Sequence, residues 1–284
     1  MRLRVMTEQD VSGGLRLNTL SGWNQTAADW RRFLKNSPLG CFVMEHDGKV
    51  VGTATTILFE NRFAWIGMVL VDPEYRKQGI GTALLEKTIE HLDDSNIPIM
   101  KLDATPQGKP IYTRLGFVEE YEIERWILKR PPSASSTGGS AVSTPIIEEQ
   151  KEQIFRRDKE LFGADRSFLL RALCGEAPEF ATVIWEDESL QAYGFGRRGL
   201  FADHLGPWMA RTQSAAGQIL QGFLTQSSRE TVIVDGMKSN AMAVDVLRSC
   251  GFAPSRPLTR MVRGPNLYPG KPGSFCAILG PEFG

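Results

Sequence analysis

The sequence predicts an α/β protein, of the α+β type with a mixed sheet, built from two tandem domains. Each domain is expected to hold a mixed, mostly antiparallel twisted sheet flanked by helices. Three observations predict this fold. The chain has 284 residues, enough for two domains with a core each. Strand-like apolar runs alternate with runs of helical period in both halves, and a stretch rich in Ser, Gly and Pro separates the halves.

The separating stretch lies between Lys129 and Pro145 and reads KRPPSASSTGGSAVSTP. It contains almost no large apolar residue, so it cannot bury enough surface to offset the entropy of ordering. We therefore interpret residues 130–145 as a flexible linker. The two domains are expected at residues 1–129 and 146–284.

The first half predicts an antiparallel meander followed by alternating strands and helices. Strands are expected over residues 41–44 and 50–59, joined at an Asp47-Gly48 hairpin turn, and over 63–71. A helix follows, because its apolar residues recur at helical spacing: Ile80, Leu84, Leu85, Ile89 and Leu92. Further helices are expected at 27–34, with Thr26 as N-cap, and at 111–115, and further strands at 98–102 and 117–128.

The second half repeats this order in weaker form. Strands are expected at 181–185, 191–195, 199–208, 231–235 and from 252, with helices at 215–224 and 241–247. Landmarks recur as well, since Gly116-Phe117 and Gly251-Phe252 lie 135 residues apart. The same spacing of 135 separates Arg125 from Arg260, and 132 residues separate Asp103 from Asp235. The shared order indicates an internal duplication.

Charge and composition exclude several classes of protein. The chain has 33 basic and 33 acidic side chains, so it has no long-range positive field to hold a nucleic acid or an anionic membrane surface. No apolar run approaches the roughly 20 residues that span a bilayer, and the first residues do not resemble a secretory leader. We expect a cytoplasmic monomer or homodimer without nucleic-acid or membrane partners.

Neither cysteines nor histidines are spaced for a metal site. The four cysteines are isolated, which is typical of reduced, packed thiols, and no histidine has metal-ligand spacing. We therefore expect no bound metal. The sequence also shows no Ser-His-Asp order and no activated Cys.

The most informative segment runs from Val69 to Leu85 and contains the pattern V-x-P-x-x-R-x-x-G-I-G. It predicts a buried strand, a short turn, and a helix that begins near Gly79 and Gly81. The first amides of a helix lack internal partners and carry the positive end of its dipole, so they suit an anion. Arg76 adds a cation beside the turn. An ordinary tight turn is the alternative interpretation, and the full pattern favours phosphate binding over it.

At these residues the sequence resembles the GNAT superfamily of acyl-CoA-dependent N-acetyltransferases, whose motif is R/Q-x-x-G-x-G/A after a V-x-P strand end. The resemblance covers about residues 1–129 and implies acetyl-CoA as acyl donor. It implies that amides at residues 77–82 hold the pyrophosphate and that the strand at 69–71 pairs with the pantetheine arm. The implied cofactor-binding residues are Val69, Leu70, Val71, Arg76, Lys77, Gln78, Gly79, Ile80, Gly81 and Thr82.

Acetyl transfer requires a neutral amine, donors for the oxyanion and a proton for the leaving thiolate. Tyr112 matches the tyrosine of the family's Y-x-x-x-G-F pattern, which implies a general acid; a packed core residue is the alternative. Asp103 ends a strand, where it would bind or deprotonate an ammonium, or simply cap a turn. Many relatives carry an acidic base on the strand before the motif, but here residues 66–69 read IGMV. A water chain or a residue elsewhere would then relay the proton.

Trp23 and Asn24 lie where the family builds its substrate wall. An aromatic ring beside an amide suits a small ligand with an apolar body and a polar tip. Trp23 fits equally well as a core anchor.

The second half resembles the degenerate C-terminal domain of bacterial tandem acetyltransferases. Residues 205–217 keep a strand and a helix but lack the Arg and the glycine loop, and Leu247 takes the place of Tyr112. We expect no productive acetyl-CoA binding here, and a role in closing the acceptor site. Asp235 and Arg260 are candidates to bind a charged group of the acceptor, with a structural ion pair as the alternative.

The expected function is therefore acetyl-CoA-dependent transfer of an acetyl group to a small-molecule amine, by direct attack in a ternary complex. Two alternatives stay open. One is acetylation of a protein or peptide amine. The other is a non-catalytic acyl-CoA sensor, against which the retained Tyr112 counts.

Overall fold

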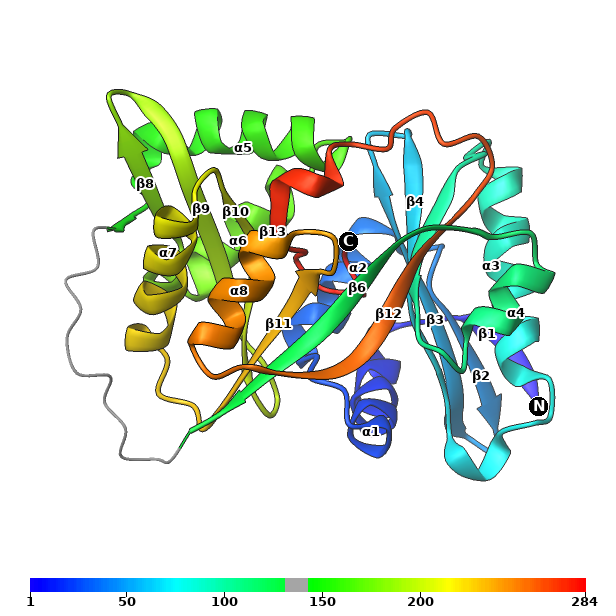
Figure 1. Cartoon of the computed structure of the whole chain (residues 1–284). Coiled ribbons are helices and arrows are strands. Elements are labelled where there is room, and N and C mark those ends of the chain that lie inside the picture. The colour runs from blue at the N-terminus through cyan, green and yellow to red at the C-terminus, as the bar shows by residue number, and fades with distance from the viewer. Residues whose placement is uncertain (131–142) are drawn as a thin grey trace. The chain divides into compact units, whose positions relative to one another are not determined.

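A computed structural model gives the structure of the chain and describes residues 1–130 and 143–284 (Figure 1). These residues form two compact units. Unit 1 comprises Met1–Glu120, Arg260–Leu267 and Phe283, and unit 2 comprises Tyr121–Thr259, Tyr268–Glu282 and Gly284. Most of the expected linker, residues 131–142, lies outside the described residues. The division into 1–129, 130–145 and 146–284 stays a prediction.

Unit 1 holds a mixed sheet with strand order β1-β2-β3-β4-β5. Neighbouring strands are antiparallel except β4 and β5, which are parallel. Residues 260–263, at the end of β12, also belong to this unit. The elements are β1 (Arg2–Val5), α1 (Val11–Ser21), α2 (Ala27–Asn36), β2 (Phe42–His46), β3 (Lys49–Phe59), β4 (Phe63–Val71), α3 (Ile80–Asp94), β5 (Met100–Ala104) and α4 (Lys109–Arg114).

Local sequence signals explain most of these elements. Asp47 and Gly48 have φ values of 49° and 75°, the left-handed conformation that a tight hairpin between β2 and β3 requires. The Thr26 side chain accepts a hydrogen bond from the Asp29 N–H and caps α2. The expected apolar face of α3 is buried, and Gly52 lets the helix approach, because a Cβ there would lie 2.8 Å from the Ile80 side chain.

Unit 2 has the strand order β12-β6-β11-β13-β10-β9-β8-β7. Residues 118–120 of β6 and 260–263 of β12 belong to unit 1. The elements are β6 (Val118–Lys129), β7 (Thr144–Pro145), α5 (Glu148–Phe162), α6 (Ser167–Glu176), β8 (Thr182–Glu186), β9 (Ser189–Arg198), β10 (Asp203–Ala210), α7 (Gln213–Gln226), β11 (Thr231–Met237), α8 (Ala241–Ser249), β12 (Ala253–Arg263) and β13 (Phe275–Ala277).

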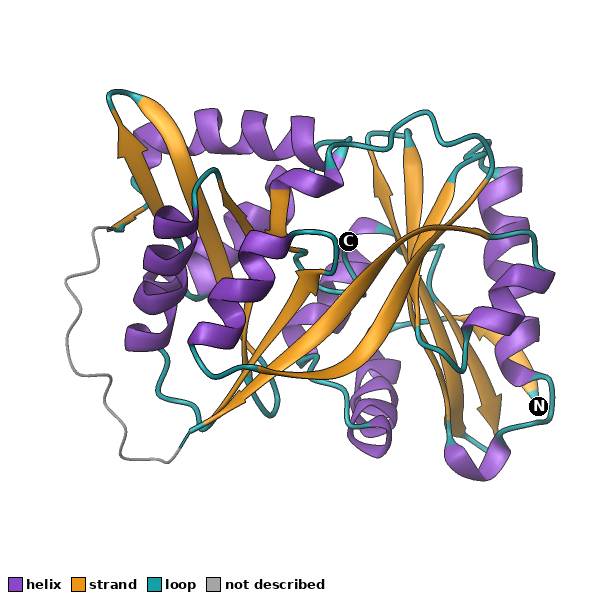
Figure 2. Cartoon of the chain, viewed as in Figure 1, coloured by secondary structure: helices purple, strands orange, loops and turns teal. Residues whose placement is uncertain are grey.

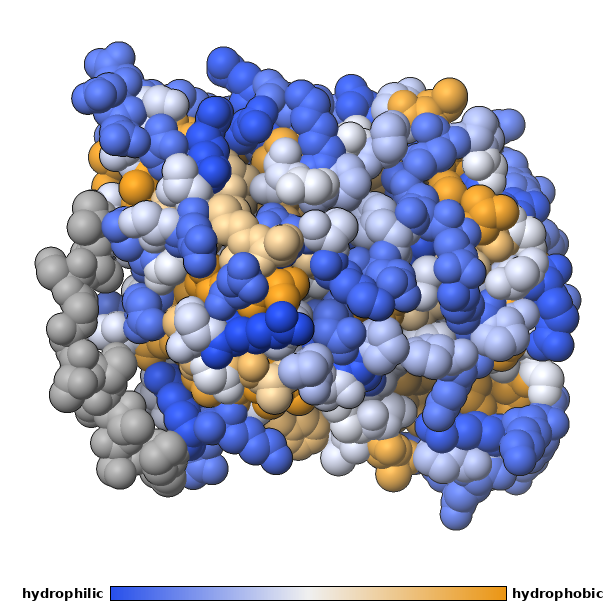
Figure 3. Space-filling model, viewed as in Figure 1, coloured by the Kyte–Doolittle hydropathy of each residue, from blue (hydrophilic) through white to orange (hydrophobic). Residues whose placement is uncertain are grey.

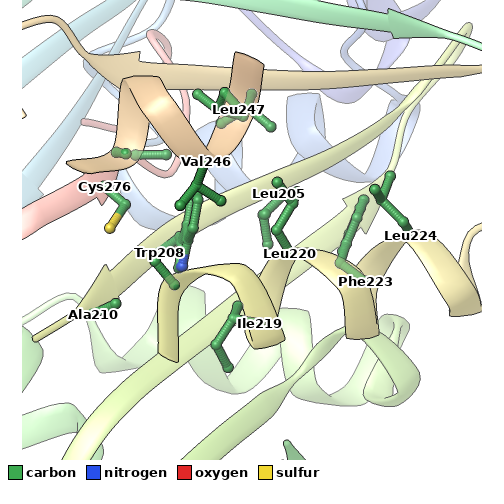
Figure 4. Packing of buried hydrophobic residues seen from close by; sticks show 14 of the residues in the cluster. Leu205, Trp208, Ala210, Ile219, Leu220, Phe223, Leu224, Val246, Leu247 and Cys276 are labelled. Carbon is green, nitrogen blue, oxygen red and sulfur yellow. The ribbon is translucent and has the colours of Figure 1, made fainter. Parts of the chain in front are cut away.

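The core of unit 2 packs α7 and α8 on the central strands. Figure 4 shows Leu205 and Trp208 of β10 in one cluster with Leu220 of α7, Leu247 of α8 and Cys276 of β13. These side chains are fully buried. A three-residue strand near the end of the sequence therefore contributes to the centre of the unit.

The predicted fold class is confirmed, since mixed sheets with flanking helices form both units (Figure 2). The side-chain patterns predicted no bounds for β1, α1, β7, α5, α6 or β13. Hydrophilic residues cover most of the face shown in Figure 3, with hydrophobic ones in small areas. Within the described ranges, no helix has both the length and the apolar character needed to cross a bilayer.

Candidate functional site

The turn between β4 and α3 leaves the first amides of the helix open. Lys77 and Gly79 adopt left-handed φ values of 62° and 80°. Gly79 is the N-cap of α3, and no side chain caps it. A Cβ on Gly79 would meet nothing within 4 Å. Because no side chain caps them, the first amides of α3 are left to water or to a ligand, and such amides suit an anion.

The two parallel strands beside this turn separate before β4 ends. Ala64 pairs with Met100 and Trp65 with Lys101, and the register between the strands stops there. The rest of β4, residues 66–71, has no registered partner in β5. Arg76 is exposed just beyond the strand, and its Nε donates to the Val71 carbonyl oxygen over 3.2 Å. The open edge of β4 thus leads directly to the open end of α3.

Tyr112, on α4, packs beside this region with its hydroxyl group unbonded. Its ring lies edge-on to Phe117, with centroids 6.1 Å apart, and a Cβ on Gly108 would come within 2.8 Å of the ring. The described residues offer the hydroxyl no hydrogen-bond partner. Burial raises the pKa of Tyr112 to about 12. The phenol is therefore protonated at neutral pH and available as a donor.

Asp103, the candidate base, is held by Arg260. Arg260 Nε donates to Oδ1 and Nη2 to Oδ2, both over 2.8 Å. The Asp103 side chain is 0% exposed and that of Arg260 5%. The guanidinium also lies 4.4 Å from the centroid of the Trp65 ring. The structure brings these two candidate residues together as a buried ion pair, and their roles in acceptor binding and proton removal stay predictions.

Asp235, another candidate for acceptor binding, forms the equivalent ion pair in unit 2. Arg125 donates to its two carboxylate oxygens, both over 2.7 Å, and His204 Nε2 lies 3.1 Å from Oδ2. Burial alone would raise the pKa of Asp235, but the charges of Arg125 and the contact with His204 outweigh it and hold this pKa well below its usual range. Asp235 is thus a partnered carboxylate in the interior of unit 2.

Trp23 and Asn24 lie in the loop between α1 and α2. Trp23 is half-buried, and its backbone N–H donates to the Asn18 carbonyl oxygen over 2.9 Å. Asn24 is buried. The sequence reading missed Asn18 and Gln25, whose buried side-chain oxygens have no partner among the described residues. The cluster of amide side chains on either side of a tryptophan is the sequence pattern that could have identified them. A role of this loop as a wall of the substrate site stays a prediction.

Unit 1 has an uncapped N-terminus of α3 and an edge of β4 without a registered partner in β5, and in unit 2 both equivalent positions are occupied. Thr212 caps α7, because its side chain accepts from the Ala215 N–H over 3.2 Å. Strand β13 occupies the space between β10 and β11 and pairs with both, through Trp208 with Ala277 and Gly236 with Ala277. Leu247, in the place assigned to Tyr112, is fully buried. Unit 2 therefore has neither an uncapped helix end nor a free strand edge at the equivalent positions.

In the part of the chain that the structure describes, no group of three or more His, Cys, Asp and Glu side chains is arranged to hold a metal ion.

Comparison with known families matches both halves. The Acetyltransferase (GNAT) family matches residues 15–117, and the Acetyltransferase (GNAT) domain matches residues 154–274. The matches include the turn before α3 in the first half and the capped α7 in the second.

Two curated relatives align with most of the chain. An uncharacterized N-acetyltransferase, YitH of Bacillus subtilis, is 27% identical over 75% of this chain and 74% of its own length. Holothin acyltransferase of a Pseudoalteromonas species is 23% identical over 85% of this chain and 81% of its own. Among solved structures, a putative acetyltransferase from Pyrococcus horikoshii shares the fold, with a TM-score of 0.79, 22% identity, and coverage of 100% of this chain and 95% of that one.

Proposed function

Because this chain belongs to the GNAT acetyltransferase family, with one family domain in each half, we propose that it transfers an acetyl group from acetyl-CoA to the amine of a small molecule. Acyltransferase activity follows from the family. The main observation in favour of acetyl-CoA as the acyl donor is the N-terminus of α3. No side chain caps it, and Lys77 and Gly79 before it adopt left-handed backbone conformations.

The residues of unit 1 fit the chemical groups of acetyl-CoA. The amides at residues 77–82 would bind the pyrophosphate, with Arg76 as an added cation. The edge of β4 at residues 69–71 has no registered partner in β5, so it could pair with the amide-containing pantetheine arm. When bound, acetyl-CoA supplies an acyl group activated as a thioester.

Tyr112 is the proposed acid. The acceptor amine attacks the thioester carbon directly, and the departing thiolate takes the phenolic proton. With a pKa of about 12, Tyr112 keeps that proton under neutral conditions. Both Asp103 oxygens accept from Arg260, so we propose that Asp103 orients Arg260 and that water removes the proton of the amine.

Two observations support a small acceptor over a peptide. The half-buried Trp23 beside buried Asn24 offers an apolar surface next to a polar group. The relative named as a holothin acyltransferase aligns over 85% of this chain, which takes in at least part of each family domain.

Release of the CoA thiol from acetyl-CoA, measured with a panel of small amines and of peptides, tests the proposal, with acetylated products identified by mass spectrometry. We expect thiol release with at least one small amine and none above background with peptides. Release with peptides alone would overturn the small-molecule acceptor, and no release with any amine would overturn the activity.

A further inference from the structure

Two buried threonines of β3 bind the backbone of β4 near the place where β4 separates from β5. The Thr53 hydroxyl donates to the Met68 carbonyl oxygen over 2.7 Å, and the Thr55 hydroxyl donates to the Gly67 carbonyl oxygen over 3.1 Å. Both threonines are 0% exposed. Two side chains of one strand thus bind two consecutive carbonyls of the next.

This arrangement requires a bulge in β4. Thr53 lies opposite Leu70 and Thr55 opposite Gly67, so Ala54 faces two residues, Met68 and Val69. Successive carbonyls of a regular strand point to opposite edges. Met68 breaks the alternation with a left-handed φ of 51°, which costs energy in a residue with a Cβ. The two threonine hydroxyls stabilise this conformation.

The bulge aims two neighbouring N–H groups in one direction. In a trans peptide the N–H points opposite to the C=O of the same peptide unit. The Gly67 and Met68 carbonyls contact threonines of β3, so the N–H groups of Met68 and Val69 point away from those threonines. That direction is toward the edge of β4 on which the register with β5 has already stopped.

We infer that Thr53 and Thr55 are positioning residues for acyl transfer. Through the Gly67 and Met68 carbonyls they hold the Met68 and Val69 N–H groups as donors to the thioester oxygen, on which negative charge develops as the amine attacks. The inference rests on the proposed function. It assigns the threonines no contact with substrate, only control over the direction of two backbone donors.

Thr56 is a matched control on the same strand. It is 1% exposed, and its hydroxyl also donates to a backbone carbonyl, that of Gly40, over 3.0 Å. Replacing it with valine removes an equally buried hydrogen bond but leaves the bulge intact. Thr55→Val and Thr53→Val remove the bonds to β4, and Thr55→Ser keeps the hydroxyl.

The direct readout is the carbonyl stretching frequency of bound [1-¹³C]acetyl-CoA, measured by isotope-edited infrared spectroscopy without an acceptor. We expect the wild-type chain to lower this frequency relative to free acetyl-CoA. Thr55→Val and Thr53→Val should return it toward the free value, whereas Thr55→Ser and Thr56→Val should match wild type. In turnover, the two bulge valines should lower kcat by about tenfold to a hundredfold and change the KM for acetyl-CoA by less than about threefold.

Melting temperatures of all four variants control for folding. If Thr55→Val does not fold, Thr53→Val carries the test through the other hydroxyl. Wild-type frequency and kcat in the bulge valines, or an equal loss in Thr56→Val, would overturn the inference and leave the acetyltransferase activity standing. A wild-type chain that binds no acetyl-CoA would overturn the proposed function and the inference together.

Discussion

Asp103 and Arg260, 157 residues apart in the chain, form a buried bidentate ion pair in unit 1. Arg125 and Asp235 form the same pair in unit 2. The repeat makes Asp103 equivalent to Asp235 and Arg125 equivalent to Arg260. Each aspartate therefore pairs with the arginine contributed by the other half of the sequence. Arg260, from the second half, supplies the partner of a buried carboxylate in unit 1.

Loss of Arg260 should strongly destabilise the protein. Arg260→Ala leaves the buried Asp103 carboxylate without its guanidinium, which should lower the free energy of unfolding by about 3–5 kcal/mol. Arg263→Ala is the control, because Arg263 pairs with Asp93 at the surface, with side chains 31% and 48% exposed, and such pairs contribute at most about 1 kcal/mol. Denaturant unfolding measures the free energy of unfolding of both variants. Equal decreases in the two variants would contradict a special role of the buried pair.

Replacement of Tyr112 by phenylalanine should separate catalysis from binding. The ring still packs on Phe117, so stability and acetyl-CoA affinity should change little, while kcat falls more than about tenfold with the loss of the acid. Since the pKa of Tyr112 is raised to about 12, ionisation of this phenol should not lower wild-type activity below about pH 10. Steady-state kinetics and calorimetry measure these effects. An unchanged kcat would remove Tyr112 from the mechanism.

Acid should destabilise the protein partly through His204. Burial lowers the pKa of His204 below its usual 6.5, despite the opposing contact with Asp235. The unfolded chain therefore binds a proton that the folded chain excludes, so the stabilising contribution is present above about pH 6.5 and lost as the pH falls. The free energy of unfolding, measured in urea between about pH 7.5 and 5.5, should depend less steeply on pH in His204→Gln than in wild type. A wild-type pH dependence in His204→Gln would refute this origin.

Gly79 should matter for the phosphate site more than for folding. A Cβ at this position has open space but a strained φ of 80°, which should cost about 1–2 kcal/mol of stability. The same Cβ projects into the space where the pyrophosphate would lie, so Gly79→Ala should weaken acetyl-CoA binding by about tenfold or more. Gly217→Ala, in α7 and equally free of neighbours, should leave affinity unchanged. Equal affinities in the two variants would argue against the site.

The local parts of this structure were predictable. The V-x-P-x-x-R-x-x-G-I-G pattern predicts the strand, turn and helix start, because each depends on residues a few positions apart, and the hairpin at Asp47-Gly48 and the cap at Thr26 follow from the same local rules. The apolar face of α3 is equally readable, since it repeats at helical spacing.

The non-local parts were not. Similar spacings, 135 and 132 residues, identified Arg125 with Arg260 and Asp103 with Asp235, but they gave no sign that the partners are exchanged between the halves. Strand β13 is three residues long and follows a Pro- and Gly-rich segment, so its pattern resembles a loop. Its place between β10 and β11 depends on backbone pairing that side-chain patterns do not encode.

We propose a division of labour in which unit 1 binds acetyl-CoA at the start of α3, whereas unit 2 has filled the equivalent space with β13 and capped α7 with Thr212. Calorimetric titration of the full chain with acetyl-CoA tests it most directly. We expect one acetyl-CoA bound per chain, and we expect Gly79→Ala to weaken binding at that single site. Two sites per chain, or one site that Gly79→Ala leaves unchanged, would contradict it.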